Sequence, residues 1–257
     1  MALLEARGIA KRFGGIAALG DVSLTIGDGE IYGLIGPNGA GKTTFFNCLT
    51  GLYRHDAGSF HLAGTLLDTA SPDRVVKRGI ARTFQNIRLF AGLSVLENVM
   101  VGRHARSQAG ALGAVLRTRA FQAEEAAVRN RALELLGYVG LAARRDEPAR
   151  SLSYGDQRRL EIARALATDP RLLALDEPAA GMNATETQVL RQLLERIRAD
   201  GVTLLLIEHD VKLVMGLCDR LAVLDFGQLV VEGTPDIVRR DPAVIAAYLG
   251  AGTEEAA

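Results

Sequence analysis

The sequence is short of several residue types on which particular kinds of site depend. Its 257 residues include no tryptophan, four histidines and two cysteines, Cys48 and Cys218, which stand far apart. Because neither cysteine has a CxxC or CxxH neighbour, the sequence indicates neither a disulfide framework nor a zinc site. Lysine plus arginine and aspartate plus glutamate number 30 each, so the net charge gives no indication of a nucleic-acid partner.

Long apolar runs are missing as well. No window approaches the roughly 18 apolar residues of a membrane-spanning helix. Glu5 and Arg7 interrupt the start of the chain, where a secretory signal needs an apolar stretch. We therefore expect a cytoplasmic protein that reaches a membrane only through a partner. Hydrophobic residues still make up 48% of the chain, which suits a globular protein with a sizeable core.

Short apolar runs and helical periodicity alternate along the chain. Runs of β-formers and of continuous apolar residues predict strands at 3–9, 20–26, 30–35, 171–176 and 202–207. Helical spacing of apolar residues predicts helices at 42–49 and 184–199. Polar residues follow the last two strands, as is typical of buried parallel strands whose carboxyl ends carry chemistry. The sequence therefore predicts an α/β fold.

Residues 94–150 differ from the rest in composition. They are rich in Ala, Arg, Glu and Leu, they contain few β-branched residues, and their apolar positions keep a helical spacing. We interpret this segment as a helical subdomain inserted between the two halves of the sheet. The last residues, 251–257, are small and polar, and we expect them to be frayed.

A phosphate-binding loop stands between the third predicted strand and the helix that follows. Residues 36–43, GPNGAGKT, fit G-x-x-x-x-G-K-[ST] in the strand–loop–helix context that this motif requires. Glycines let backbone N–H groups surround phosphates, the lysine meets the β- and γ-phosphates, and the threonine hydroxyl can bind Mg²⁺. The expected nucleotide-binding residues here are Gly36, Pro37, Asn38, Gly39, Ala40, Gly41, Lys42, Thr43 and Thr44.

Two acids follow the apolar strand LLALD. Asp176 stands where a Mg²⁺-nucleotide site needs a carboxylate, and Glu177 can orient an attacking water as general base. An isolated LDEP would instead be a helix cap before Pro178, but the phosphate loop favours the catalytic interpretation. His209 ends another apolar strand; taken alone it would be a structural histidine, and beside these acids it becomes a candidate γ-phosphate contact.

A second potential anion site begins at LSYGDQ. Ser153 and Asp156 have the spacing of a capping box, and a well-capped helix would explain this stretch by itself. The order of motifs indicates more: a phosphate loop, Gln85, LSYGDQ, LLALDE and His209 follow one another along the chain. This series resembles the ATP-binding cassette (ABC) ATPases over nearly the whole chain.

The resemblance implies a fold and a way of working. The fold would be a RecA-like P-loop core with an N-terminal antiparallel β-subdomain and an inserted α-helical subdomain. One ABC ATPase domain would cover 1–257, with 1–86 and 162–235 as the nucleotide-binding core and β-subdomain, 87–161 as the helical subdomain, and 236–257 as a C-terminal helix and tail. Two such domains would pack head to tail. The LSYGDQ segment at 152–157, called the second loop below, would then cover the nucleotide of the other domain.

Carried over to matching positions, the resemblance implies roles for individual residues. Phe13 would stack on adenine, while Ser153, Gly155 and Asp156 would contact the nucleotide across the dimer interface. Glu177 would be the catalytic base, His209 would hold the γ-phosphate, and Gln85 would sense Mg²⁺ and the water. Mg²⁺ would lie among Thr43, Gln85 and Asp176, so the expected cofactors are ATP and Mg²⁺. Without the resemblance, Phe13 could equally be an aromatic of the core or of a pocket lip.

The chain departs from the commoner pattern at three positions. Tyr154 replaces a glycine of the usual signature, Asp156 replaces a glutamine, and Asn183 stands where many relatives have aspartate. The serine and the second glycine of the signature remain, so we expect it to function. Asn183 affects the expected geometry across the interface, and the catalytic set is complete.

Further sequence segments resemble one particular group within this family. LSYGDQRRLEIARALA, DEPAAGMN, IEHDVKLVMGLCDR and the C-terminal EGTPDIVRRDPAVIAAYLG, with a long insert between Val101 and Phe121, resemble the ATPase of branched-chain (hydrophobic) amino-acid importers. The implied partners are a second, related ATPase, two membrane permease subunits and, indirectly, an extracytoplasmic binding protein. The chain would lie on the inner face of the cytoplasmic membrane, held by the permease.

Alternatives remain open at this stage. The chain could instead be the homodimeric ATPase of a lipid or lipopolysaccharide exporter, because such ATPases share the EPxAG motif. A DNA-handling cassette ATPase would need a long coiled-coil or zinc-bearing insertion, which is missing here. A binding module without catalysis would not need Glu177 and His209. The solute could be leucine, isoleucine, valine, another apolar amino acid, urea or a short amide, and the sequence does not decide whether the chain pairs with itself in isolation.

Overall fold

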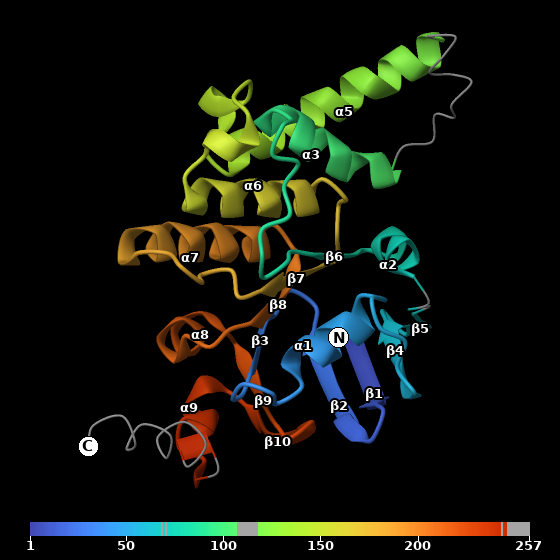
Figure 1. Ribbon diagram of the computed structural model, residues 1–257, viewed down its shortest axis with the longest axis vertical. Helices are drawn as coiled ribbons and strands as arrows, with labels where there is room; N and C mark the ends of the chain where they lie inside the picture. Colours follow the sequence, from blue (N-terminus) through green and yellow to red (C-terminus); the bar gives the residue numbers. More distant parts are fainter. Residues whose placement is uncertain (68, 70, 107–117, 243, 246–257) are drawn as a thin grey trace.

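The protein is built from two sheets and a layer of helices. A computed structural model describes residues 1–67, 69, 71–106, 118–242 and 244–245. Figure 1 shows the strands and α1 in the lower part of the molecule and the helices α3, α5 and α6 stacked above them, with α7 between. The expected α/β fold with an antiparallel β-subdomain and an inserted helical subdomain is confirmed.

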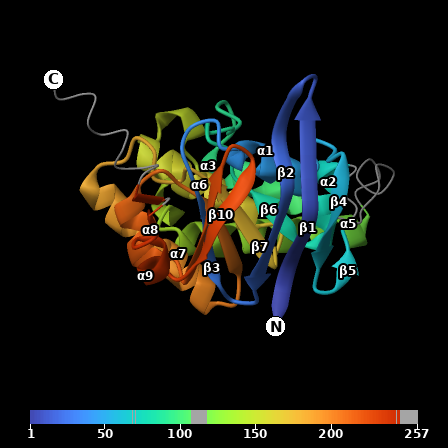
Figure 2. The ribbon, with the colours of Figure 1, turned by 90° about the horizontal axis from the view of Figure 1, so that it is seen from below.

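The β-subdomain is a four-stranded antiparallel sheet of order β2-β1-β4-β5. Its strands are β1 (Ala2–Phe13), β2 (Ile16–Gly27), β4 (Ala57–Leu62) and β5 (Thr65–Leu66). Figure 2, the view from below, shows β1 and β2 side by side with β10 next to β2. There the backbone N–H of Gly20 donates to the carbonyl oxygen of Gly227 at 2.8 Å, which connects the two sheets.

The larger sheet has six strands in the order β10-β9-β3-β8-β7-β6. They are β3 (Ile31–Ile35), β6 (Ile80–Arg82), β7 (Leu172–Asp176), β8 (Thr203–Ile207), β9 (Arg220–Asp225) and β10 (Gln228–Gly233). All neighbours pair in parallel except β10, which returns antiparallel to β9. Every residue of β3, β7 and β8 is buried, as expected for central strands covered on both faces.

The helices predicted at 42–49 and 184–199 coincide with α1 and α7, and the structure adds further helices. The helices are α1 (Lys42–Leu49), α2 (Pro72–Arg78), α3 (Val95–Arg103), α5 (Arg119–Tyr138), α6 (Tyr154–Leu166), α7 (Ala184–Ala199), α8 (Val211–Leu217) and α9 (Pro235–Val238), with 3₁₀ turns at 104–106, 142–144 and 149–151. Among the described residues, no helix is long and apolar enough to cross a membrane.

Alternation along the central strands divides the apolar interior into two cores. Leu173 and Leu175 of β7 pack with the helical layer, whereas Leu172 and Ala174 pack with α1 and the β-subdomain. Successive side chains of a strand point to opposite faces of its sheet, so each central strand contributes to both cores. The carboxyl ends of these strands, where the polar residues stand, therefore lie between the two halves of the molecule.

One of the expected domain boundaries falls inside a helix. The boundary expected between 161 and 162 falls inside α6, which the structure describes as one helix from Tyr154 to Leu166. The central part of the long insert, 107–117, and the tail 251–257 lie outside the described residues. The division into 1–86, 87–161, 162–235 and 236–257 stays a prediction.

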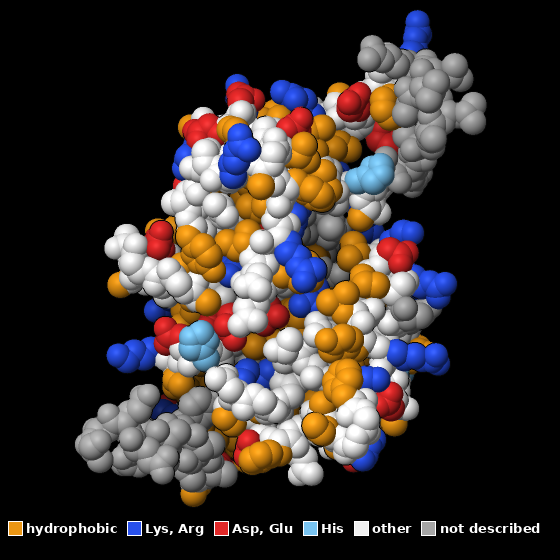
Figure 3. Space-filling model, viewed as in Figure 1, with side chains coloured by type: hydrophobic (Ala, Val, Ile, Leu, Met, Phe, Trp, Pro, Cys, Tyr) orange, Lys and Arg blue, Asp and Glu red, His pale blue; other side chains and the backbone are white. Residues whose placement is uncertain are grey.

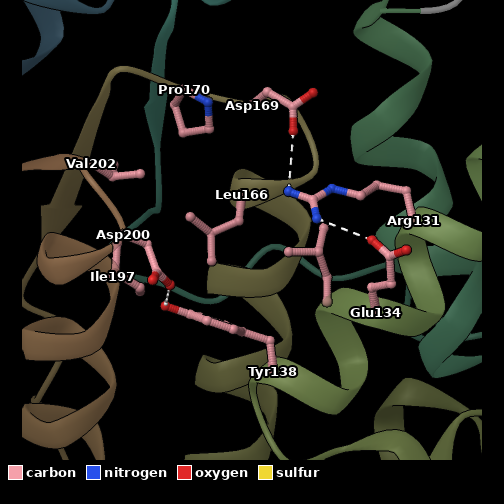
Figure 4. Close-up of a pocket in the computed structure, with 10 residues that line it drawn as sticks. Arg131, Glu134, Tyr138, Leu166, Asp169, Pro170, Ile197, Asp200 and Val202 are labelled. Carbon is pink, nitrogen blue, oxygen red and sulfur yellow. Dashed lines mark hydrogen bonds and ion pairs between the residues drawn. The ribbon is translucent and has the colours of Figure 1, made fainter.

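The helical layer and the core also face each other across a cavity of about 450 Å³. Figure 4 shows α5 on one wall, with Arg131 and Tyr138, and the ends of α7 and β8 on the other. The hydroxyl of Tyr138 donates to Asp200 Oδ2 at 2.6 Å, and Arg131 pairs with Asp169 at 3.4 Å. Because Asp169 and Val202 precede β7 and β8, this cavity lies at the strand ends opposite to those that carry Asp176 and His209.

Candidate active site

The phosphate loop has a backbone shape that requires glycine. Gly36 follows β3 with φ of 151°, and a Cβ atom there would lie 2.1 Å from the carbonyl oxygen of Leu224. Gly41, which caps α1, has φ of 103°, and its Cβ would lie 2.6 Å from the carbonyl oxygen of Ala18. Both contacts are with backbone atoms that cannot move aside. Both positions therefore require glycine, and without side chains there the backbone N–H groups of the loop can approach a ligand closely.

Lys42 lies at the centre of this loop, in the first turn of α1. Its side chain is 8% exposed, and Nζ donates to the carbonyl oxygens of Gly36 at 2.7 Å and Pro37 at 2.9 Å. Burial lowers the pKa of Lys42, while the carboxylates of Glu177 and Asp176 raise it. The ammonium group is thus desolvated and interacts with two carboxylates, and its hydrogen bonds within the described residues go to loop carbonyls, which suits exchange for a phosphate oxygen.

Three of the predicted catalytic residues meet at one carboxylate. Gln85 Nε2 donates to Glu177 Oε2 at 2.9 Å, and His209 Nδ1 lies 3.7 Å from the same oxygen. Gln85 follows β6, Glu177 follows β7 and His209 follows β8, so the parallel sheet brings their strand ends together. The structure thereby places the candidate base next to both polar groups that were expected to accompany it.

The backbone at Glu177 is strained in the way that functional sites often are. Its φ is 46°, in the left-handed region that glutamate rarely occupies. Its N–H donates to the carbonyl oxygen of Ile207 at 2.8 Å, one pairing beyond the parallel register of β7 and β8. The two adjacent acids have different partners, because Asp176 lies 3.6 Å from Arg82 whereas Glu177 accepts from Gln85.

Asp176 ends β7 in a buried position with an arginine nearby. Burial raises the pKa of its carboxyl group, and Arg82, 3.6 Å away, lowers it. Arg82 itself donates to Asn47 Oδ1 at 2.9 Å and Thr50 Oγ1 at 2.7 Å on α1. It thus connects the expected metal ligand to the helix of the phosphate loop. Arg82 was not predicted, although a charged residue directly after the short apolar run of Ile80 and Ala81 was a usable signal.

The oxygen ligands expected for a metal fit Mg²⁺ in kind. They comprise the exposed hydroxyl of Thr43, the amide of Gln85 and the carboxylate of Asp176. The described part of the chain contains no group of three or more His, Cys, Asp or Glu side chains that could hold an ion by itself.

Phe13 lies at the end of β1 with an aromatic neighbour. Its ring is 45% exposed, and its centroid is 5.4 Å from that of Tyr53 in an edge-to-face arrangement. Lys11 Nζ lies 5.4 Å from the same ring. An exposed ring held by a second aromatic suits stacking on a flat ligand. Tyr53, in the turn after α1, was not predicted, and no motif marked it.

The second loop is a capped helix start. Ser153 is the N-cap of α6, and its hydroxyl accepts from the N–H of Asp156 at 3.2 Å. The carboxylate of Asp156 does not return to Ser153; it binds Arg144 at 2.8 Å and also pairs with Arg159. Only half of the capping box suggested by the sequence is therefore formed. A Cβ on Gly155 would lie 2.9 Å from Glu186 Oε1.

The two loops do not meet within the chain. Figure 1 shows α6 in the helical layer and α1 in the lower part of the molecule. Throughout the described ranges, no hydrogen bond or ion pair joins Ser153, Gly155 or Asp156 to residues 36–44. Lys42 of the phosphate loop interacts electrostatically with Glu177 and Asp176, and Gln85 and His209 flank Glu177, so these residues form one cluster. The second loop lies apart from residues 36–44.

Two family models match the sequence. An "ABC transporter" model matches residues 19–180. A model described as "Branched-chain amino acid ATP-binding cassette transporter" matches residues 228–254. The first range contains every predicted site residue except Phe13 and His209, and the second begins at β10.

Curated relatives match over nearly their full length. The chain is 45% identical to the high-affinity branched-chain amino acid transport ATP-binding protein LivG of Escherichia coli strain K12, over 96% of this chain and 98% of that one. It is 43% identical to BraF of Pseudomonas aeruginosa, which bears the same description, with the same coverage. The lipopolysaccharide export system ATP-binding protein LptB of E. coli is 36% identical, over 97% and 98%.

Solved structures show the same fold. A nucleotide-free ATP-binding cassette from an ABC transporter superposes with a TM-score of 0.85 at 31% identity, covering 96% of this chain and 99% of that one. An ATP-binding cassette in its ADP conformation also has a TM-score of 0.85, at 32% identity, over 97% and 99%. The expected fold class is confirmed, and the relatives favour the importer interpretation over the exporter alternative.

Proposed function

The chain belongs to the ABC transporter family as an ATP-hydrolysing subunit, and we propose that it powers the uptake of branched-chain amino acids across the cytoplasmic membrane. The observation that carries this proposal is the match of residues 228–254 to the branched-chain amino acid model. The higher identity to LivG and BraF than to LptB supports the same choice.

The proposed chemistry rests on the cluster at the strand ends. Lys42 and the N–H groups of the phosphate loop would bind the phosphates, and Phe13 would stack on adenine. Glu177 would orient the attacking water, with Gln85 and His209 on either side of its carboxylate. Mg²⁺, when bound by Thr43 and Asp176, would neutralise phosphate charge.

The proposed assembly gives the second loop its purpose. Cassettes of this family dimerise and work with membrane permease subunits. In a head-to-tail pair, the start of α6 from one chain would cover the nucleotide of the other, and a helix N-terminus with free N–H groups suits an anion. The separation of this loop from the chain's own residues 36–44 supports that arrangement. We propose a second, related ATPase as the partner in the transporter.

A groove beside Gln85 suits the permease. It has a volume of about 300 Å³ and lies between α2, β6, α3 and α6, with Phe84, Phe90 and Val101 among its apolar lining. In Figure 3, hydrophobic side chains gather over α3 and again below it on the right, toward α2 and β4. We propose that a cytoplasmic helix of the permease docks here, which holds the chain on the inner face of the membrane. An extracytoplasmic binding protein would deliver the solute.

Uptake of labelled leucine by cells carrying Lys42→Ala tests the proposal. We expect uptake to be lost with an intact envelope, because the loop loses its phosphate-binding cation. An envelope-permeability assay runs alongside. Normal uptake with a leaky envelope would support the exporter function instead.

Substituting Arg88 or Phe90 with acidic residues tests the docking groove. These variants should uncouple ATP hydrolysis from uptake, and intact coupling would contradict the groove.

A further inference from the structure

Helix α6 contains a buried pair of opposite charges close to its start. Arg158 and Glu161 are one turn apart, both have 0% side-chain exposure, and Arg158 Nη1 lies 3.1 Å from Glu161 Oε2. Moving two charges out of water is unfavourable unless hydrogen bonds compensate. Such a pair adds little net stability, so its position and its other partners are more informative than its energy.

The partners of Arg158 belong to the loop that contains Gln85. Nη1 donates to the carbonyl oxygen of Phe84 at 2.6 Å, and Nη2 donates to the carbonyl oxygen of Gln85 at 2.8 Å. Glu161 Oε1 accepts from the N–H groups of Phe84 at 3.3 Å and Arg88 at 3.4 Å. Four backbone groups of residues 84–88 are therefore held by two side chains of α6.

Gln85 connects this contact to the catalytic cluster. Its carbonyl oxygen accepts from Arg158, and its side-chain amide donates to Glu177 Oε2 at 2.9 Å. A single residue thus separates the buried arginine from the candidate base. Arg158 is therefore in a position to pass a shift of α6 to the amide beside Glu177, because the contacts are short and the arginine is fully enclosed.

Tyr154 extends the connection to the start of the helix. Its hydroxyl accepts from Arg158 Nη2 at 3.0 Å, and its ring centroid lies 5.7 Å from the guanidinium carbon. Tyr154 directly follows Ser153, and it occupies the position where the commoner signature has glycine. A glycine could not make either contact. Tyr154, in place of the usual glycine, thus contacts and supports Arg158.

We propose that Arg158, supported by Tyr154, is a positioning residue that couples the two nucleotide sites of the dimer. When Ser153 engages the partner's nucleotide, α6 moves as a unit and Arg158 carries the carbonyl of Gln85 with it. Gln85 then adopts its working position beside this chain's own Glu177. The inference rests on the head-to-tail dimer of the proposed function, and it assigns a role to two residues outside the phosphate loop.

The test uses the complex that this chain forms with its partner ATPase and permease subunits, purified through a tag on this chain. ATP hydrolysis is measured against ATP concentration for the wild type, Arg158→Gln, Arg158→Lys and Tyr154→Phe. Arg103→Gln is the matched control, because Arg103 binds the opposite end of α6 through the carbonyl oxygen of Ala167 at 3.3 Å. Melting temperature and ATP binding are recorded for each variant.

The expected results separate positioning from folding. Arg158→Gln should lower kcat by about tenfold and leave KM within about twofold, because a small misplacement of a catalytic group costs rate more than binding. The Hill coefficient should fall from above about 1.5 to about 1. Arg158→Lys should recover part of the loss, Tyr154→Phe should reduce the Hill coefficient with little change in melting temperature, and Arg103→Gln should match the wild type.

Two results would overturn the proposal. One is an unchanged Hill coefficient in both Arg158→Gln and Tyr154→Phe. The other is a wild-type Hill coefficient of about 1 in an active complex, because there would then be no coupling to carry. Failure of the proposed function has a different signature: no permease would co-purify, or Lys42→Ala cells would import leucine normally. Tyr154→Phe removes one hydroxyl and keeps the test valid if Arg158→Gln does not fold.

Discussion

The starts of α1 and α6 use the same helix-end chemistry in opposite ways. The cap of α1 is Gly41 in a left-handed conformation, without a side-chain cap and without an acid in the first turn, and Lys42 follows at once. The start of α6 is closed by the Ser153 hydroxyl and contains Asp156. The first start therefore offers open N–H groups and a cation to an anion. At the second start, the Ser153 hydroxyl already accepts from one of these groups, the N–H of Asp156.

Glycine geometry makes the same distinction. The loop before α1 has no room for a Cβ at Gly36, because the obstacle is the carbonyl oxygen of Leu224. At Gly155, in the first turn of α6, the obstacle is the carboxylate end of Glu186, a flexible side chain. One loop is shaped by rigid backbone and the other by a movable neighbour. Variants at these two helix starts, and at the sites connected to them, can break or sharpen the comparison.

The largest effect is expected at the base beside the first loop. Glu177→Gln should lower ATP turnover by about 10³-fold while nucleotide binding persists, because the amide cannot accept the proton of the attacking water. Steady-state hydrolysis and equilibrium binding of a fluorescent ATP analogue measure the two quantities. Glu195→Gln, at an exposed position of α7, is the control and should behave as wild type. Equal turnover in Glu177→Gln and wild type would reject the base.

Alanine at the two glycines should give unequal results. Gly36→Ala should abolish nucleotide binding and destabilise the protein by about 3 kcal/mol or more, because backbone atoms must move. Gly155→Ala should leave nucleotide binding by the single chain unchanged and cost about 1 kcal/mol, since the Glu186 side chain can rotate at the loss of its bond from the N–H of Asn183. Binding assays and urea unfolding test both. Similar losses for the two variants would contradict the comparison.

The cap of the second helix should have a moderate effect. Ser153→Ala should cost about 1 kcal/mol of stability, the usual value of an N-cap hydroxyl. Thr118→Ala removes an equivalent cap from α5, where the hydroxyl accepts from Phe121 N–H at 3.3 Å. Both variants should lower the unfolding free energy alike, but only Ser153→Ala should reduce ATP turnover. If Thr118→Ala reduced turnover equally, the function of Ser153 would be structural.

The smallest effect is expected far from both helix starts, at the cavity of Figure 4. Tyr138→Phe removes the bond to Asp200 and should cost about 1 kcal/mol without changing turnover. Burial raises the pKa of Tyr138 to about 12. A raised pKa means that this contribution is complete below about pH 10 and is lost as pH rises toward 12. Unfolding at pH 7 and pH 11 measures it, and equal differences at both values would contradict this origin.

Local motifs could be predicted because their chemistry is short-range. GPNGAGKT specifies a loop and a helix start within eight residues, and the structure places α1 at Lys42–Leu49, as the spacing predicts. Buried strands such as LLALD were recognisable from their apolar runs. The place of Asp176 and Glu177 at a strand end also followed from order along the chain. The roles of these residues stay predictions until the variants above are measured.

Contacts between distant segments could not be predicted from such local motifs. Gln85 and Glu177 are 92 positions apart, and Arg158 and Gln85 are 73 apart. Gln85 could be predicted through a family resemblance, whereas Arg158 was not predicted, because an arginine in an amphipathic helix is ordinarily a solvated residue. Its complete burial depends on how α6 packs against the loop after β6, and no local pattern encodes that.

The sequence by itself determined the apolar central strands, the helices at 42–49 and 184–199 and the two glycine-containing helix starts, since each depends on backbone preferences and on periodicity within a few residues. Tertiary structure alone decided which of them meet. It joined the ends of β6, β7 and β8 at Glu177, and it kept the start of α6 away from the phosphate loop. Sheet order and helix packing depend on apolar burial over the whole chain, and they decide which polar groups share a site.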